Sequence, residues 1–112
     1  MTEQPIKRGD IWWVSLDPTL GSEIKKTCPC VVLTHDTLNQ LRRTVVVLPL
    51  STAAKPHPLI TVPVTCQGNP AVAVIDQIRA VSKLRLKSKI ASLDQDELEQ
   101  VVRAVSVILE IT

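Results

Sequence analysis

The residues best suited to chemistry lie in a polar loop that runs into an apolar strand. The loop, residues 17–27, offers a turn glycine, a carboxylate at Glu23 and a pair of lysines. It leads to Cys28, and a residue before a proline is restricted to extended backbone, which suits a strand start at Pro29. The apolar run 30–33 is typical of a buried strand. Because binding residues usually lie on loops held by a rigid scaffold, we expect a binding site here.

Two further features could take part in binding. A second polar loop, residues 51–58, opens with the hydroxyl of Ser51. Trp12 and Trp13 are adjacent, and alternation along a strand at 11–16 places one ring in the core and the other towards a partner, a groove or solvent. Packing is the commoner role of such rings. The alternative for the outward ring is a surface on which an RNA base stacks.

The three cysteines form no recognisable metal motif. Cys28, Cys30 and Cys66, together with His35 and His57, do not have the spacing of a zinc site. We also expect Cys28 and Cys30 to face opposite sides of an extended segment, which would keep them from sharing a metal. A nucleophilic pair of Cys28 with a histidine is equally weakly indicated. An odd cysteine count without a signal peptide favours a reducing, cytoplasmic compartment.

Length and composition predict one small β-rich domain, residues 1–112. The chain is 45% hydrophobic and rich in valine, which favours strands. Its net charge of +2 gives no strong field for nucleic acid. We interpret basic clusters such as Lys7-Arg8 and the run 83–89 as solvated faces, with RNA backbone contact as the alternative. No apolar run approaches membrane-spanning length.

The pattern predicts strands joined by polar segments. Pro49 indicates an edge position or a bulge near the end of the third strand, and Pro63 interrupts the fourth. Residues 1–8 are expected to be a loose arm, 35–43 a connection with room for a helical turn, and 67–70 a turn. The expected strands are 11–16, 30–34, 44–50, 59–65 and 71–75, with a sixth short strand or a bend at 77–81.

The last element is predicted to be an amphipathic helix. Ser92 and Gln95 can form a capping box, and acidic residues follow in the first turn. Apolar residues then recur at helical spacing over about four turns. Short strands at regular spacing with one terminal helix favour a small, strongly bent antiparallel barrel.

Several motifs occur in one order along nearly the whole chain: Arg8-Gly-Asp-Ile-Trp-Trp13, Leu16-Asp-Pro18, Gly21-Ser-Glu23, Pro29-Cys-Val-Val-Leu33, Leu48-Pro-Leu-Ser-Thr52 and Asp76-Gln-Ile-Arg79. In this order and spacing they resemble the MazF/PemK family of toxin endoribonucleases from type II toxin–antitoxin systems. The resemblance implies a mainly β fold with α: a small SH3-like antiparallel β-barrel of five to seven strands plus a C-terminal α-helix, assembled as a homodimer.

The resemblance also implies an activity. The family cuts single-stranded RNA at short sequences through attack by the ribose 2′-hydroxyl, without a metal or cofactor. This reaction needs a base, an acid for the leaving 5′-oxygen, and donors or cations for the phosphorane charge. The implied partners are single-stranded RNA and a cognate antitoxin whose flexible acidic tail occupies the RNA groove.

Carried over by position, the implied catalytic residues are Cys28, Ser51 and Glu23. The Ser51 hydroxyl would hydrogen-bond the scissile phosphate, and Glu23 would act in catalysis or positioning. Taken singly, Ser51 is more simply a turn residue, Glu23 a solvated loop residue and Asp76 a strand-end cap. The implied groove lies between loops 22–27 and 51–58. Its substrate-binding residues would be Ser22, Lys25, Lys26, Thr27, Thr52, Asp76 and Gln77.

The resemblance fails at Cys28, where the family normally has arginine directly before the proline. Arginine offers a permanently charged planar fork for phosphate, whereas cysteine is a weak, mostly neutral donor. Losing such a group typically costs on the order of 10²–10⁴-fold in rate, so we predict weak or absent cleavage.

Two explanations of Cys28 stay open. The chain is an attenuated family member, or the arginine was lost in a clone because an active toxin kills its host; we favour the second because the rest of the pattern is intact. The alternative function is a non-catalytic RNA- or protein-binding module on the same barrel, as in gyrase-directed toxins.

Overall fold

The computed structural model describes residues 4–16 and 27–111. In these ranges the chain forms seven strands, two α-helices and two short 3₁₀ turns. In chain order they are β1 (Asp10–Ser15), β2 (Thr27–Val32), α1 (Asp36–Leu41), β3 (Thr44–Ser51), β4 (Thr61–Cys66), β5 (Asn69–Val74), η1 (Ile75–Gln77), β6 (Arg79–Ser82), η2 (Lys83–Arg85), β7 (Leu86–Ser92) and α2 (Gln95–Ile108).

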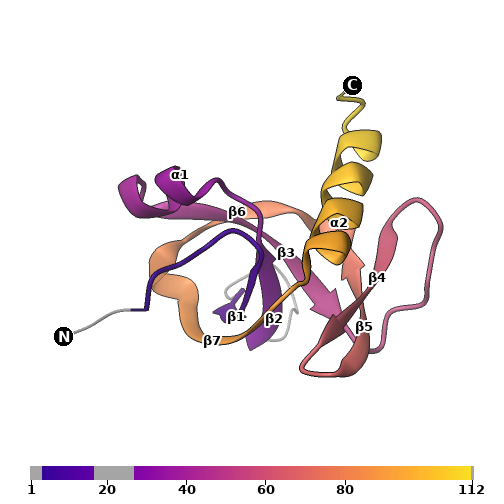
Figure 1. Ribbon diagram of the computed structural model, residues 1–112, viewed down its shortest axis with the longest axis horizontal. Coiled ribbons are helices and arrows are strands. Elements are labelled where there is room, and N and C mark those ends of the chain that lie inside the picture. Colours follow the sequence, from indigo (N-terminus) through magenta and orange to yellow (C-terminus); the bar gives the residue numbers. More distant parts are fainter. Residues whose placement is uncertain (1–3, 17–26, 112) are drawn as a thin grey trace, which may run out of the picture.

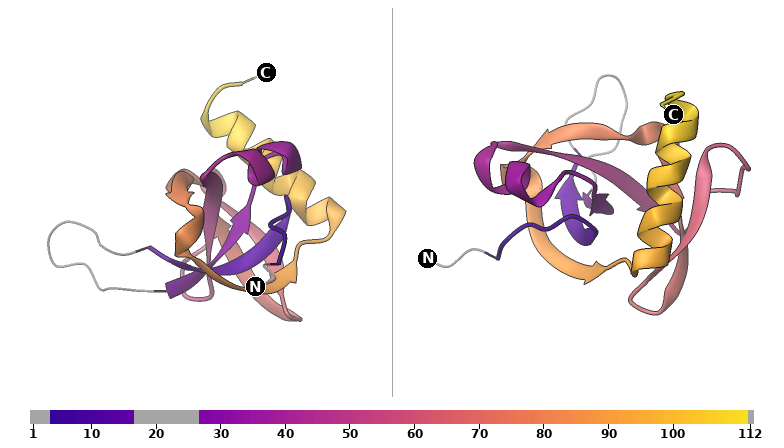
Figure 2. Two further views of the ribbon diagram at one scale, coloured as in Figure 1. Left: turned by 90° about the vertical axis from the view of Figure 1, so that its left-hand side faces the viewer. Right: turned by 45° about the horizontal axis from the view of Figure 1, so that its top comes forward.

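All strand pairs are antiparallel, and together they form one curled sheet in the order β4-β5-β3-β2-β1-β7. The central strand β3 pairs with β2 along one side. Along its other side it pairs first with β6 and then with β5. The sheet bends so far that the β4–β5 hairpin reaches β7, where the Gln67 side-chain amide donates to the Ile90 carbonyl at 3.5 Å. Figures 1 and 2 show this half-closed barrel with α2 lying across it.

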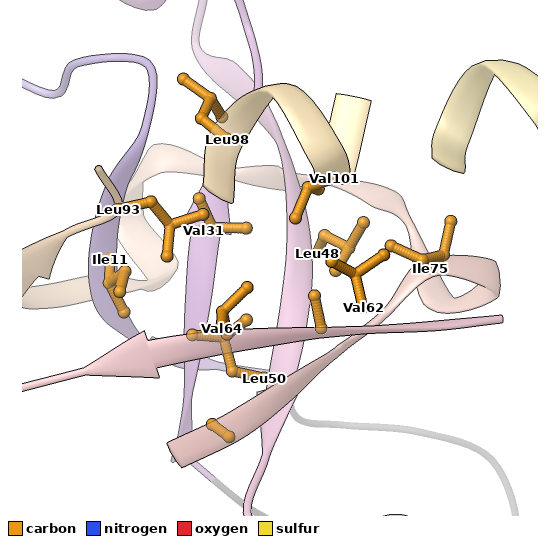
Figure 3. Close-up of a cluster of buried hydrophobic side chains, with 12 residues drawn as sticks. Ile11, Val31, Leu48, Leu50, Val62, Val64, Ile75, Leu93, Leu98 and Val101 are labelled. Atoms are coloured by element: carbon orange, nitrogen blue, oxygen red, sulfur yellow. The ribbon is translucent and has the colours of Figure 1, made fainter. Parts of the chain in front are cut away.

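The side chains of the sheet divide into two hydrophobic clusters because strand residues alternate between faces. The first cluster lies under α2: Leu98 and Val101 of the helix pack over Val31, Leu48 and neighbouring strand residues (Figure 3). The second cluster lies on the other face of β1, β2 and β3, where β6 and β7 curl over it. Its buried members are Trp12, Val14, Cys30, Val32, Val45, Val47, Val81 and Leu86.

The predicted fold class is confirmed: a mainly β, curled antiparallel barrel with one C-terminal helix. The tryptophan prediction is also confirmed, since Trp12 is 6% exposed in the second cluster and Trp13 is 40% exposed. The predicted turn is a tight hairpin between β4 and β5 in which Gln67 and Gly68 have φ of 53° and 80°. A turn of two left-handed residues matches the twist of its strands.

Two expectations about prolines in strands are wrong. Pro49 does not mark an edge strand, because β3 is central and Pro49 pairs with Cys30 of β2. It lies instead where β3 exchanges partners, after Val47 pairs with β6 and before Leu50 pairs with β5. The proline is tolerated at this gap in the ladder. Pro63 does not interrupt the fourth strand either, because it pairs with Val72 inside β4, an edge strand where a proline is tolerated.

The expected helix start was misplaced. The N-cap is Asp94, whose carboxylate accepts from the backbone N–H of Glu97 at 2.8 Å. Ser92 is unavailable for capping because it ends β7 and its hydroxyl donates to Asp10 at 3.3 Å. The amphipathic helix itself is confirmed over 14 residues, or about four turns.

Two polar segments are more ordered than expected. Arg8, assigned to a loose arm, donates from its backbone N–H to Asp36 at 2.7 Å and from its side chain to the Leu33 carbonyl at 3.2 Å. The basic run 83–89, which we interpreted as a solvated face, forms η2 and most of β7. Its four cations, Lys83, Arg85, Lys87 and Lys89, each contact an oxygen of this same chain.

Within residues 4–16 and 27–111, neither α-helix has the length and apolar character needed to cross a bilayer.

Candidate active site

The ladder between β2 and β3 relates Cys28 to Ser51. Its pairs are Val32 with Val47, Val31 with Leu48, and Cys30 with Pro49. Continuing this register by two residues puts Cys28 level with Ser51, and facing residues of antiparallel strands have Cα atoms about 4.5–5.5 Å apart. Both are an even number of residues from members of the second cluster, so they share its face of the sheet.

The Ser51 hydroxyl is fixed by the turn that follows it. Its oxygen accepts hydrogen bonds from the backbone N–H groups of Ala53 at 3.1 Å and Ala54 at 2.9 Å. A hydroxyl has two acceptor sites and one donor. Because both acceptor sites are occupied, the O–H is left to donate, for example to an anionic oxygen. In this geometry Ser51 is suited to bind a phosphate and poorly suited to act as a base or nucleophile.

Cys28 and Cys30 share a face, so the expectation that they point to opposite sides is wrong. Residues two apart on a strand always return to the same side, and the Cys30 thiol lies 3.8 Å from the Cys28 carbonyl oxygen. A hydrogen bond with the Cys28 side chain and then burial raise the pKa of Cys30 well above its usual range, while the Arg79 charge acts in the opposite direction. Cys30 therefore stays a neutral, buried thiol.

Arg79 is a cation on this face that the sequence-based site did not include. It begins β6 and pairs with Val47 of β3, and its charge is felt at Cys30. Its guanidinium donates to the carbonyl of Leu16 at 3.1 Å, at the point where β1 leads towards loop 17–26. Arg85 does the same for the adjacent Ser15 carbonyl at 3.2 Å. The two arginines therefore hold the last described residues before the polar loop.

A cavity of about 170 Å³ opens beside Ser51. Ser51 and Thr52 line it together with Pro29 of β2 and the half-exposed ring of Trp13. The rest of the lining comes from β3, the β4–β5 hairpin and β7. These residues are Leu50, Cys66, Gln67, Asn69, Ala71 and Ile90. Burial raises the pKa of the Cys66 thiol, which keeps this wall of the cavity uncharged near neutral pH.

The other expected site residues fall into three groups. Thr27 is exposed at the start of β2 and pairs with Ser15, and Thr52 is exposed next to Ser51. Asp76 and Gln77 are exposed in η1, which follows the far end of β5; Val72 is the residue of β5 that pairs with Ser51. The structure therefore does not bring these two to Ser51. The positions outside the described residues are Ser22, Glu23, Lys25 and Lys26.

In the part of the chain that the structure describes, no three His, Cys, Asp or Glu side chains lie close enough together to bind a metal ion. What the arrangement offers is a fixed hydroxyl donor, a nearby arginine and an apolar cavity at the ends of two strands.

A curled barrel crossed by one helix, with a polar site where strands end, is a class of fold that solved structures share. The structure of MazF from Deinococcus radiodurans superposes with a TM-score of 0.85 at 22% identity, covering 97% of this chain and 100% of that one. A mycobacterial endoribonuclease in complex with its cognate antitoxin superposes with a TM-score of 0.77 at 17% identity, covering 95% and 96%.

The sequence places the chain within this class. The model of the PemK-like, MazF-like toxins of type II toxin–antitoxin systems matches residues 7–109, and the chain belongs to that family. It is 29% identical over 109 residues to endoribonuclease EndoA of Bacillus subtilis, covering 93% of this chain and 94% of that protein. The expected family is therefore confirmed.

Proposed function

We propose that this chain is the toxin of a toxin–antitoxin pair and a metal-independent endoribonuclease for single-stranded RNA, weakened by the cysteine at position 28. The observation that supports the proposal is the register of β2 and β3, whose last pair, Cys30 with Pro49, lies two residues from Cys28 on one strand and from Ser51 on the other. The similarity to a protein named an endoribonuclease supports the same reaction class.

The residues divide the work as follows. Ser51 donates its O–H to a non-bridging oxygen of the scissile phosphate, since the N–H groups of Ala53 and Ala54 occupy its acceptor sites. The substrate supplies the nucleophile, the ribose 2′-hydroxyl. The group at position 28 should neutralise the charge that develops on the phosphorane, and a cysteine cannot do so. Arg79 holds the base of the loop that carries Glu23 through the Leu16 carbonyl.

The test is to restore the charge with Cys28→Arg. Cleavage of a labelled single-stranded RNA should rise by on the order of 10²–10⁴-fold. Cys28→Lys supplies a charge without the planar fork and should recover only part of this gain, and Cys28→Ala should match the starting protein. RNA with 2′-deoxyribose at the cut should resist cleavage.

Two results would overturn the proposal. The first is an arginine form that folds and still leaves single-stranded RNA intact. The second is cleavage of the 2′-deoxy substrate, which would exclude the 2′-hydroxyl as nucleophile. RNA binding by the arginine form without products would instead favour the non-catalytic binding module.

The proposal extends to partners. We propose a cytoplasmic homodimer that binds an antitoxin. Several large apolar side chains at and after the end of α2 are more than half exposed, Val107, Leu109 and Ile111, and exposed apolar groups of this kind suit an interface. Light scattering on the purified chain should give twice the monomer mass, and a monomer across micromolar concentrations would contradict the dimer.

A further inference from the structure

The cavity beside Ser51 has an unusual lining for a site next to a phosphate, because no charged side chain contributes to it. Its walls are the Trp13 ring, Pro29 and four apolar or thiol side chains, Leu50, Cys66, Ala71 and Ile90. Burial raises the pKa of the Cys66 thiol, which keeps it neutral. Such walls favour an uncharged, flat group and disfavour a phosphate, which would lose hydration without gaining a cation.

The size of the cavity limits the group that fits. An apolar protein cavity of roughly 150 Å³ holds a benzene molecule, and this one is about 170 Å³. One six-membered ring therefore fits, whereas the fused rings of a purine require more room. The Trp13 ring, 40% exposed, supplies an aromatic face at the entrance.

The polar lining consists of amides and hydroxyls. Gln67 lies in the tight β4–β5 turn, where it and Gly68 adopt left-handed backbone conformations, and Asn69 directly follows this turn. The Gln67 amide is anchored by its contact with the Ile90 carbonyl across the cavity rim. An amide side chain offers both a donor and an acceptor, which are the groups needed to pair with the edge of a nucleobase.

We propose that this cavity is a pocket for one pyrimidine base of the RNA, next to the scissile phosphate. The base stacks on Trp13, and Gln67 and Asn69 bind its edge. The placement rests on the proposed function, because Ser51 lines the cavity and also binds the phosphate in that mechanism. Stacking of a base on an aromatic side chain raises affinity by roughly 5- to 140-fold.

Nuclear magnetic resonance of the chain as it stands tests the pocket directly, because its two indole N–H groups act as probe and control. Trp13 is exposed, whereas Trp12 is buried and donates to Asp10 at 3.5 Å. The probes are the four nucleoside 3′-monophosphates and inorganic phosphate. The uridine and cytidine nucleotides should shift the Trp13 signal at about tenfold lower concentration than the purine nucleotides, leaving Trp12 unmoved. Inorganic phosphate should move neither.

The size limit has its own variant. Ile90→Ala removes three carbons from the wall and should admit purine nucleotides, reducing the preference to about threefold or less. Thermal unfolding of the variant checks that it folds. In the Cys28→Arg form, sequenced RNA ends should show a pyrimidine at one fixed position beside the cut, and Ile90→Ala should relax that bias.

The outcomes separate this inference from the proposed function. Cleavage by the arginine form without base bias, with a Trp13 signal that ignores all nucleotides, overturns the pocket and leaves the nuclease. A Trp13 shift with pyrimidine nucleotides but no RNA cleavage keeps the pocket and overturns the nuclease. An equal response to purines and pyrimidines overturns the size argument, and a Trp13 signal that moves only with an antitoxin peptide assigns the cavity to that protein.

Discussion

The two ends of the β1–β2 ladder use polar residues in different ways. At one end Asp10 is 4% exposed, and its carboxylate accepts from the Lys7 backbone, the Ser92 hydroxyl and the Trp12 ring N–H while pairing with Lys89 at 3.4 Å. At the other end Ser15 pairs with an exposed Thr27, and the next residue of β2, Cys28, is half-buried. The carboxylate at the first end is satisfied within the chain, and the second end is where we propose that a ligand binds.

The difference follows from what each end must hold. A buried carboxylate is costly unless hydrogen bonds and a counter-charge satisfy it, so Asp10 requires partners from this same chain. Near the second end, the turn after Ser51 occupies only the lone pairs of its hydroxyl, and among the described residues no acceptor is found for its O–H. A substitution should therefore affect stability at the first end and cleavage at the second.

The largest effect is expected for Ser51→Ala in the Cys28→Arg form. Removing one donor to a developing oxyanion typically lowers the rate by on the order of 10²–10³-fold. Ser51→Thr keeps the hydroxyl and should stay within tenfold of the parent. Single-turnover cleavage of labelled RNA measures both, and an Ala variant as fast as the Thr variant would remove Ser51 from the mechanism.

The next largest effect should be the stability loss of Asp10→Ala. The change leaves three donors and Lys89 without their carboxylate, and we expect the free energy of unfolding to fall by about 2–3 kcal/mol. Urea unfolding measures it, with the exposed Glu99→Ala as the control, which should change it by less than about 0.5 kcal/mol. Lost cleavage with unchanged stability would contradict the assignment of this end to the fold.

A smaller effect is expected at the second end, where Arg79 and Arg85 contact the carbonyls of Leu16 and Ser15. In the Cys28→Arg form, Arg79→Met removes the charged hydrogen bond to the Leu16 carbonyl and the cation beside the cysteine face. Cleavage should fall by about tenfold. Arg85→Met breaks the matching bond to Ser15 and serves as the control, with a smaller loss expected. Equal losses would mean that Arg79 acts only through the backbone.

The smallest effect concerns thiol reactivity along β2. Only a thiolate is alkylated, and a raised pKa means a smaller thiolate fraction at any pH below it. Cys30 is fully buried and has a raised pKa, so in the folded protein it should react with iodoacetamide at least about tenfold more slowly than half-buried Cys28. Mass spectrometry of digested protein follows both sites, and equal rates in the native state would refute this gradient.

Local patterns predicted much of the fold. Alternation separated Trp12 from Trp13, and the apolar spacing after residue 95 identified α2. The predictions that failed concern residues whose partners are distant in sequence. The strand β7 was not predicted because its lysines break the apolar pattern. Their charges are satisfied by groups distant in sequence, such as Asp10, which contact them only in the folded chain. The sequence also favoured Ser92 as the helix cap, but its hydroxyl donates to the same Asp10 carboxylate instead.

The candidate site was predictable to a similar degree. Ser51 and Cys28 came from family motifs, and the β2–β3 register relates them. Arg79 was present in the same motifs, but its contact with Leu16 spans 63 positions and no local pattern reveals it. The cavity could not be foreseen either, because its lining comes from β1, β2, β3, β7 and the β4–β5 hairpin.

The pairing of β1 with β7 has a consequence for synthesis. Asp10 and Ser92 are 82 positions apart, so the edge of β1 stays uncovered until β7 has been synthesised. Chains emerge from the ribosome amino end first. A nascent chain that stops before Leu86 lacks β7 and cannot complete the sheet. Rapid proteolysis of a chain truncated at residue 85 would demonstrate this dependence.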